Sequence, residues 1–161
     1  SRGSVIPFFR SLAKTQELPI TDERMTRFMI SLEQGVELVW HAFKDSVGGE
    51  IYVKKIPSMR VVEIARTIAP HAKLKFIGIR PGEKLHEMMI SVEDARVSYE
   101  YDSYFKILPQ IYQASVDPLR IKNGAPCPDG FSYCSDSNSA WMSSDELRSW
   151  LIHEYGTALP S

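Results

Sequence analysis

The sequence has 161 residues, of which 43% are hydrophobic and 24% are charged, the composition of an ordinary globular protein. Its formal net charge of -1 provides no overall field to attract nucleic acid, so an anionic ligand would need local arginines. No apolar run approaches the roughly 20 residues of a membrane-spanning helix, and nothing resembles a signal peptide. Cys127 and Cys134 are too few for a zinc signature. We therefore expect a cytoplasmic protein with reduced thiols and neither a nucleic-acid nor a membrane partner.

The first third of the chain predicts helices at both ends and a strand between them. In chain order we expect a helix that starts near residue 5 and fades near 16, an extended segment at 18–21, a polar turn at 22–24 and a strand at 25–30. Ser31 and Gln34 form a capping box that starts the next helix. We expect its buried face to consist of Leu32, Val36, Val39, Trp40 and Phe43.

The rest of the chain continues this alternation and then becomes irregular. We expect a strand at 50–53, a helix with Ser58 as N-cap that ends before Pro70, and a strand at 73–79. Beyond residue 87 the pattern predicts a small strand at 88–90, a hairpin of strands 96–101 and 104–108, a long ordered loop at 109–138 and a terminal helix at 143–154. The fold class is therefore α/β.

One segment stands out, the run Ile79–Glu87 with its Arg80-Pro81-Gly82 core. Pro81 holds the preceding Arg80 extended and suits the first position of a helix. Arg80 is then placed where a strand ends and a helix starts, which is favourable for an anion. The alternative is an ordinary junction with a solvated arginine.

Arg27 and Glu83 have two interpretations each. Arg27 lies among apolar neighbours in a predicted strand and needs a partner, because a buried unpaired charge is costly. That partner is either a carboxylate such as Glu23 or Glu83, or a ligand diphosphate. Glu83 either caps a helix N-terminus or accepts ligand hydroxyls. The sequence contains no dinucleotide fingerprint, no nucleophile elbow and no spaced His/Cys metal cluster, so we predict no metal site within it.

Several ordered motifs resemble a known family. They are residues 1–9, 20–22, 24–28, 49–53, 56–59 and 78–87, and the tail at 133–138. Together they are similar to the C-terminal half of the inverting UDP-N-acetylglucosamine 4,6-dehydratases. These belong to the extended short-chain dehydrogenase/reductase superfamily, in the polysaccharide-biosynthesis group.

The resemblance implies that residues 1–161 are the C-terminal portion of an NAD(P)-binding Rossmann fold, with a small α+β substrate-binding subdomain and without the N-terminal dinucleotide-binding half. It implies NADP as cofactor and UDP-N-acetylglucosamine as substrate. The reaction would be oxidation at C4, loss of water from C6 and inversion at C5, giving UDP-2-acetamido-2,6-dideoxy-L-arabino-hex-4-ulose. This is the first step of bacterial pseudaminic acid biosynthesis, which serves flagellin glycosylation. Pro81 favours this group over the dehydratase/epimerases of capsule synthesis.

The same resemblance assigns residues. Ser1 and Arg2 would border the cofactor, while Arg27, Arg80 and Glu83 would hold the UDP-sugar. The catalytic groups lie in the N-terminal half, so this fragment alone is expected to be inactive, and full-length members form homo-oligomers. The alternative is a free-standing α+β binding or interaction module that kept the scaffold without the chemistry. The chain starts without methionine, and as a fragment it would expose apolar area from Val5, Phe8 and Phe9.

Overall fold

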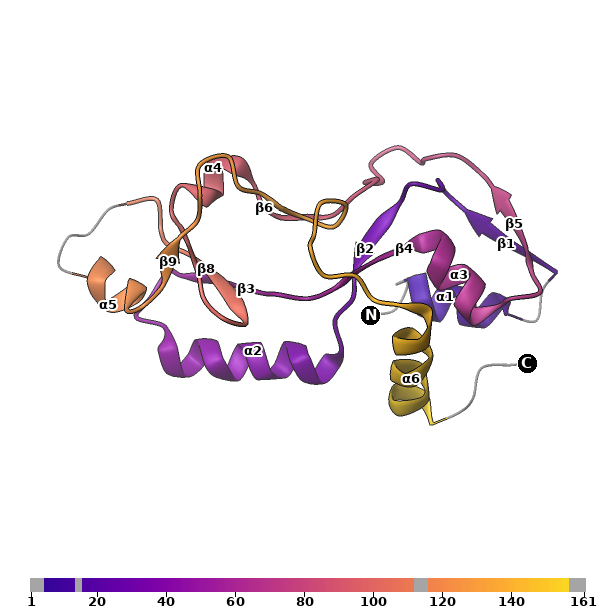
Figure 1. Ribbon diagram of the computed structural model, residues 1–161, viewed down its shortest axis with the longest axis horizontal. Coiled ribbons are helices and arrows are strands. Elements are labelled where there is room, and N and C mark those ends of the chain that lie inside the picture. Colours follow the sequence, from indigo (N-terminus) through magenta and orange to yellow (C-terminus); the bar gives the residue numbers. More distant parts are fainter. Residues whose placement is uncertain (1–4, 14–15, 112–115, 157–161) are drawn as a thin grey trace. The chain divides into compact units, whose positions relative to one another are not determined.

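The computed structural model describes residues 5–13, 16–111 and 116–156 (Figure 1). These residues form two compact units. Unit one comprises the described residues within 1–29, 57–87 and 138–161, and unit two comprises those within 30–56 and 88–137. Because segments from distant parts of the sequence build each unit, neither could be recognised as a continuous domain in the sequence.

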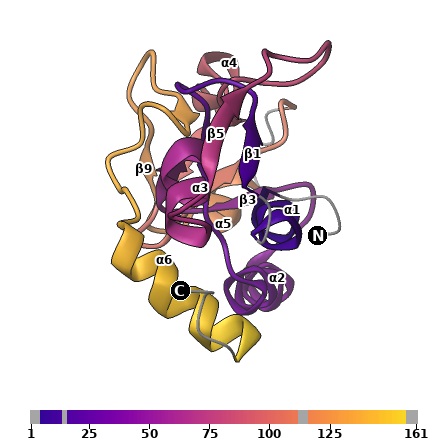
Figure 2. The same ribbon diagram turned by 90° about the vertical axis from the view of Figure 1, so that its right-hand side faces the viewer.

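Unit one contains two small sheets and three helices. Its elements are α1 (Val5–Leu12), β1 (Glu17–Ile20), β2 (Thr26–Phe28), β4 (Ser58–Arg60), α3 (Val61–Ile68), β5 (Lys73–Phe76) and α6 (Ser144–Tyr155). Strands β1 and β5 pair in parallel, and β2 pairs with β4 in antiparallel register. Figure 2 shows β1 and β5 side by side, with α3 next to them.

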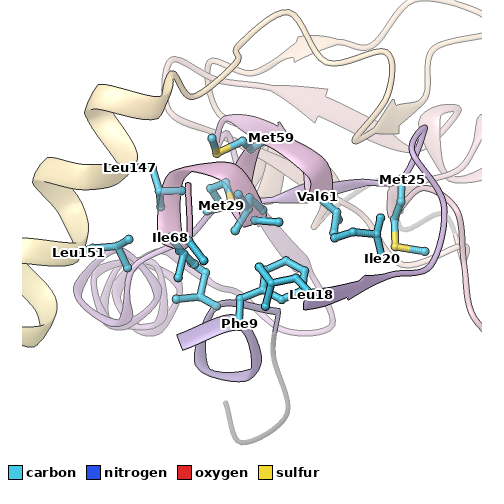
Figure 3. Close-up of a cluster of buried hydrophobic side chains, with 14 residues drawn as sticks. Phe9, Leu18, Ile20, Met25, Met29, Met59, Val61, Ile68, Leu147 and Leu151 are labelled. Carbon is cyan, nitrogen blue, oxygen red and sulfur yellow. The ribbon is translucent and has the colours of Figure 1, made fainter. Parts of the chain in front are cut away.

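The core of unit one forms where its three helices meet β1. Figure 3 shows Phe9 of α1, Leu18 of β1, Ile68 of α3 and Leu147 of α6 in one apolar cluster. Leu18, Ile68 and Leu147 have no exposed surface. Each such side chain contributes about 1.5–3 kcal/mol by leaving water. We expected Phe8 and Phe9 to expose apolar area. Phe9 is instead buried in this core, whereas Phe8 is 43% exposed.

Unit two is built on an antiparallel sheet. Its elements are α2 (Leu32–Asp45), β3 (Ile51–Lys54), β6 (Met88–Ile90), α4 (Val92–Ala95), β7 (Ser98–Glu100), β8 (Tyr104–Ile107), α5 (Asp117–Ile121), β9 (Ala125–Pro126) and β10 (Tyr133–Cys134). Four strands pair in the order β3-β8-β7-β9, and β10 pairs with β6. The predicted hairpin is the β7–β8 pair.

A buried charge network joins the sheet of unit two to α2. The Lys106 side chain on β8 is fully buried, and its ammonium donates to the Asp45 carboxylate at 2.5 Å. Lys122 also donates to Asp45, and Tyr52 donates its hydroxyl proton at 2.8 Å. Burial acts to raise the pKa of Asp45, but these hydrogen bonds outweigh it and hold the pKa well below its ordinary value.

Several predicted elements are confirmed. The capping boxes at Ser31 and Ser143 are present, and α6 matches the predicted terminal helix within a residue at each end. Other predictions were wrong. Ser58 is not a helix N-cap, because it lies in β4 with its side chain buried, where it accepts a hydrogen bond from Asn138 Nδ2 at 3.0 Å. The segment at 109–138 is not simply a loop, since it contains α5, β9 and β10.

The largest error concerns α2. We expected its apolar side chains to be buried, yet the helix has no buried residue at all. The five side chains of that face are exposed, between 46% for Val36 and 78% for Leu32. Helical periodicity identified the face correctly, but periodicity cannot say whether another element covers it.

Candidate functional site

The Arg80 segment forms a tight turn after β5. The Glu83 N–H donates to the Arg80 carbonyl at 3.0 Å, closing a four-residue turn with Pro81 at its second position. Gly82 occupies the third position with φ +81°, a value that L side chains rarely adopt. No helix follows, so our expectation of a helix start at Pro81 was wrong. The turn rather than a helix dipole determines where Arg80 lies.

Arg27, Arg80 and Glu83 line one pocket of about 260 Å³ in unit one. Thr21 lies beside them, and an apolar wall comes from α1, the start of α3 and Met25. The sequence-predicted residues therefore reach the same cavity from β2 and from the turn after β5, although more than fifty residues separate Arg27 from Arg80 along the chain. Two guanidinium charges against one carboxylate give these three groups a net charge of +1.

The Arg27 guanidinium is held mostly by backbone carbonyls. Its Nη1 donates to Thr26 O at 2.7 Å and to Leu85 O at 3.2 Å, and its Nη2 donates to Lys84 O at 3.0 Å. Its Nε lies 3.6 Å from Glu87 Oε1, so the carboxylate partner is neither Glu23 nor Glu83. Arg27 therefore fastens the Lys84–Glu87 stretch to β2 while its side chain lines the pocket.

Glu83 braces the turn from inside the pocket. Its Oε1 accepts a hydrogen bond from the Thr21 hydroxyl at 3.1 Å, and its Oε2 accepts one from the Arg80 N–H at 3.3 Å. The carboxylate thus ties the turn to the end of β1 and does not cap a helix. Because a carboxylate offers about four lone-pair positions, Glu83 retains acceptor capacity for a ligand hydroxyl.

Arg80 differs from the other two residues. It is an exposed residue at the pocket, and among the residues that the structure describes its guanidinium forms no ion pair or hydrogen bond with a protein group. Its backbone is fixed by the turn and by Glu83. The result is a positioned cation whose five donors are available to an anion.

One threonine of the site was missed in the sequence, Thr21, which holds Glu83. A second, Thr26, does not line the pocket, and its Oγ1 lies 2.8 Å from His86 Nδ1. Threonine is common at strand ends, so no sequence signal distinguished either residue. Arg24 belongs to a separate exposed pair: its side chain and N–H donate to Asp22 and lower the pKa of that carboxyl to about 2.

The described part of the chain can be compared with the residues that a cofactor or a metal ion would need. Ser1 and Arg2, expected beside a cofactor, lie outside the described residues. The described residues contain no glycine-rich turn between a strand and a helix, so they do not fit a dinucleotide pyrophosphate. They contain no group of three or more His, Cys, Asp or Glu side chains placed to hold a metal ion. No helix among them is long and apolar enough to cross a bilayer.

Known proteins resemble the chain over almost its whole length. Two curated relatives from Campylobacter jejuni strains, named UDP-N-acetylglucosamine 4,6-dehydratase (inverting), are 48% identical over 164 residues, which is 97% of this chain and 49% of each relative. A UDP-glucose 4-epimerase from Rickettsia canadensis is 38% identical over 112 residues, covering 66% of this chain and 33% of the relative. The chain thus spans about half the length of the curated dehydratases that it matches.

The fold also matches a solved structure. The X-ray structure of Pen from Bacillus thuringiensis superposes with a TM-score of 0.77 at 28% identity, over 96% of this chain and 46% of that chain. A family model described as polysaccharide biosynthesis protein matches residues 1–109. The chain belongs to this polysaccharide biosynthesis protein family.

Proposed function

We propose that this chain is the substrate-binding half of an NADP-dependent UDP-N-acetylglucosamine 4,6-dehydratase, and that the Arg80 pocket binds the diphosphate of the UDP-sugar. One observation carries the proposal: Arg80 lies at the pocket with its backbone fixed and its guanidinium unpaired among the described residues. Guanidinium groups match phosphate oxygens in fork geometry. The similarity to the inverting dehydratases supplies the substrate class.

The three site residues have different tasks in this proposal. Arg80 donates to the diphosphate. Arg27 adds positive charge but acts chiefly by holding the Lys84 and Leu85 carbonyls, which sets the path of the chain behind Arg80. Glu83 keeps the turn in place through Thr21 and accepts a hydroxyl of the ligand. The apolar side chains of α1 shield one wall from water, which strengthens charge-assisted hydrogen bonds.

The chemistry itself lies outside the described residues. NADP would supply hydride transfer at the sugar C4, and the described residues do not fit its pyrophosphate. What this chain contributes is binding and orientation, because a held diphosphate fixes the sugar for reaction elsewhere. In the proposed reaction, UDP-N-acetylglucosamine would lose a hydride from C4, then lose water across C5 and C6, and finally take the hydride back at C6 with inversion at C5, so that no net oxidant is consumed. Pro81 after Arg80 supports the branch that leads to pseudaminic acid and flagellin glycosylation in the cytoplasm of a bacterium.

The related epimerases provide a second candidate. The Rickettsia canadensis relative is named UDP-glucose 4-epimerase and is less similar than the dehydratases, at 38% against 48% identity. A UDP-sugar would occupy the same pocket in either enzyme, so UDP binding does not separate them. The product does: incubating the whole protein with UDP-N-acetylglucosamine gives a 4-keto-6-deoxy sugar for a dehydratase and a sugar of unchanged mass for an epimerase.

Calorimetry with UDP tests the binding site directly. We expect Arg80→Ala to weaken UDP binding by about 10- to 150-fold, because a hydrogen bond to a charged group contributes roughly 1.5–3 kcal/mol. Arg24→Ala is the matched control, since Arg24 is also an exposed arginine but pairs with Asp22 and does not line the pocket. Equal affinities for the wild-type chain and Arg80→Ala, or no binding heat from the wild type, would contradict the site assignment.

A further inference from the structure

Strand β2 holds the stretch of chain that directly follows the Arg80 turn. Within this stretch, residues 84–87, the Leu85 carbonyl accepts hydrogen bonds from the Thr26 N–H and from the Arg27 guanidinium, both at 3.2 Å. The other three residues of the stretch also contact Thr26 or Arg27, each through its own atoms. We call this set of contacts the β2 clasp. Two adjacent residues of one strand thus fix four successive residues of another segment.

One contact of the clasp joins two side chains to which the site has so far given no task. Thr26 Oγ1 lies 2.8 Å from His86 Nδ1, and which of the two atoms donates depends on the His86 tautomer. Thr26 is only 3% exposed, and a buried hydroxyl group needs a hydrogen-bond partner. Neither side chain lines the Arg80 pocket. Any effect of this pair on a ligand must therefore act through the chain that it holds.

The clasp matters because the Arg80 turn is weakly held on its upstream side. There the Ile77 N–H donates to a β1 carbonyl at 2.9 Å, just beyond the paired residues of β5. Gly78 follows with φ +82° and open space around it, and among the described residues no backbone hydrogen bond holds it. Within the turn, Glu83 is tied to Thr21. The clasp begins at the next residue, so it provides the main anchor downstream of the turn.

We propose that Thr26 and His86 are positioning residues that set Arg80 for the phosphate oxygens of a ligand, an inference that rests on the proposed function of the pocket. Their contact keeps the stretch after the turn ordered before a ligand arrives, so less conformational freedom is lost on binding. Arg27 belongs to the clasp and also lines the pocket. A slip of the clasp would therefore displace both guanidinium groups, and small displacements of positioning groups are costly.

Calorimetric titration with UDP tests the effect on binding. Thr26→Val keeps the shape of the side chain without its hydroxyl and should weaken UDP binding by about 2- to 10-fold, the worth of one hydrogen bond. Thr26→Ser restores the hydroxyl and should bind as the wild type does. Thr67→Val is the matched control, because Thr67 is also 3% exposed and hydrogen-bonded in unit one, to the Glu63 carbonyl at 2.7 Å, but does not line the pocket.

Substitutions of His86 keep the test decisive if Thr26→Val does not fold. His86→Leu should cause the same loss of affinity, and His86→Asn should bind UDP more tightly than His86→Leu, because its amide can take the place of Nδ1. The double variant Thr26→Val, His86→Leu should lose no more than either single variant, since each breaks the same contact. Additive losses would show that the two side chains act separately and would overturn the inference.

Hydrogen exchange without UDP separates positioning from the proposed function. The Glu83 N–H closes the turn on the Arg80 carbonyl, so Thr26→Val should speed exchange of that amide proton by about 2- to 10-fold, and Thr67→Val should not. Faster exchange at Glu83 with no UDP binding by the wild type would contradict the proposed function alone. Unchanged exchange in Thr26→Val would contradict this inference whether or not UDP binds. UDP affinity that is unchanged in Thr26→Val, or equally reduced in Thr67→Val, would also overturn it.

Discussion

Helices α3 and α2 carry similar apolar stripes but lie in opposite environments. In α3 the side chains of Val61, Ile64, Ala65 and Ile68 are all buried in the core of unit one. In α2 no residue is buried, and the sheet of unit two is joined to it through a histidine and a carboxylate. Amphipathic periodicity thus predicts that a helix forms and which of its faces is apolar. It does not predict which element, if any, covers that face.

Truncating a buried side chain of α3 should produce the largest change in the free energy of unfolding. Ile64→Ala on α3 removes a side chain with no exposed surface and should lower the free energy of unfolding by about 2–5 kcal/mol, through lost burial and a residual cavity. Val36→Ala on α2 should change it by less than about 0.5 kcal/mol, because Val36 is 46% exposed. Urea denaturation followed by circular dichroism measures both. A comparable loss for the two variants would mean that α2 is covered in the isolated chain.

Acid should destabilise unit two through Glu50. Burial acts to raise the pKa of Glu50, but hydrogen bonds from Ser46, Val47 and Gly48 prevail and lower it from 4.5 to about 2. The folded protein thus holds this carboxylate ionised where the unfolded chain binds a proton. The contribution, roughly 3 kcal/mol, is fully present above pH 4.5 and is lost as the pH falls towards 2.

Glu50→Gln isolates this contribution. The variant should be less stable at neutral pH and should show a shallower loss of stability between about pH 4.5 and 2. Urea denaturation at a series of pH values provides the measurement. The Ile64→Ala variant is the comparison, since a purely apolar change should shift the curve down without altering its slope. Parallel curves for wild type and Glu50→Gln would rule out the assigned pKa.

Substitution of two glycines by alanine should give the smallest changes in stability, and the two changes should have opposite signs. Gly82→Ala in the Arg80 turn should destabilise by about 1 kcal/mol, because φ is +81° although an added Cβ meets no atom within 4 Å. Gly35→Ala inside α2 should stabilise by about 0.5–1 kcal/mol, since its Cβ also has open space and alanine favours a helix. Thermal unfolding compares the two. Stabilisation by Gly82→Ala would show that the turn adopts another conformation.

The sequence predicted local structure better than packing. Capping boxes identified the starts of α2 and α6, since a serine with Gln or Glu three residues later satisfies free N–H groups locally. The Pro-Gly pair was misread as a helix start because proline suits both a helix and a turn, and only the Gly82 conformation distinguishes them. Arg27, Arg80 and Glu83 were named in advance through a family resemblance, and their shared pocket depends on the fold.

The partners of those residues could not be predicted. The carbonyls that hold Arg27 belong to residues 84 and 85, and any backbone carbonyl looks the same in a sequence. The contact between Thr21 and Glu83 could not be predicted either, because it joins residues that are 62 positions apart in the sequence. Long-range contacts of this kind arise only when β1 and β5 pair.

The central claim is that the pocket around Arg80 binds the diphosphate of a UDP-sugar. Titration of the isotopically labelled wild-type chain with UDP, followed by residue-resolved NMR, tests it most directly. We predict that amide shifts concentrate at Thr21, Arg27, Arg80 and Glu83 in unit one, and that the stripe on α2 shows no change. Shifts that avoid these four residues, or no shifts at millimolar UDP, would contradict the account.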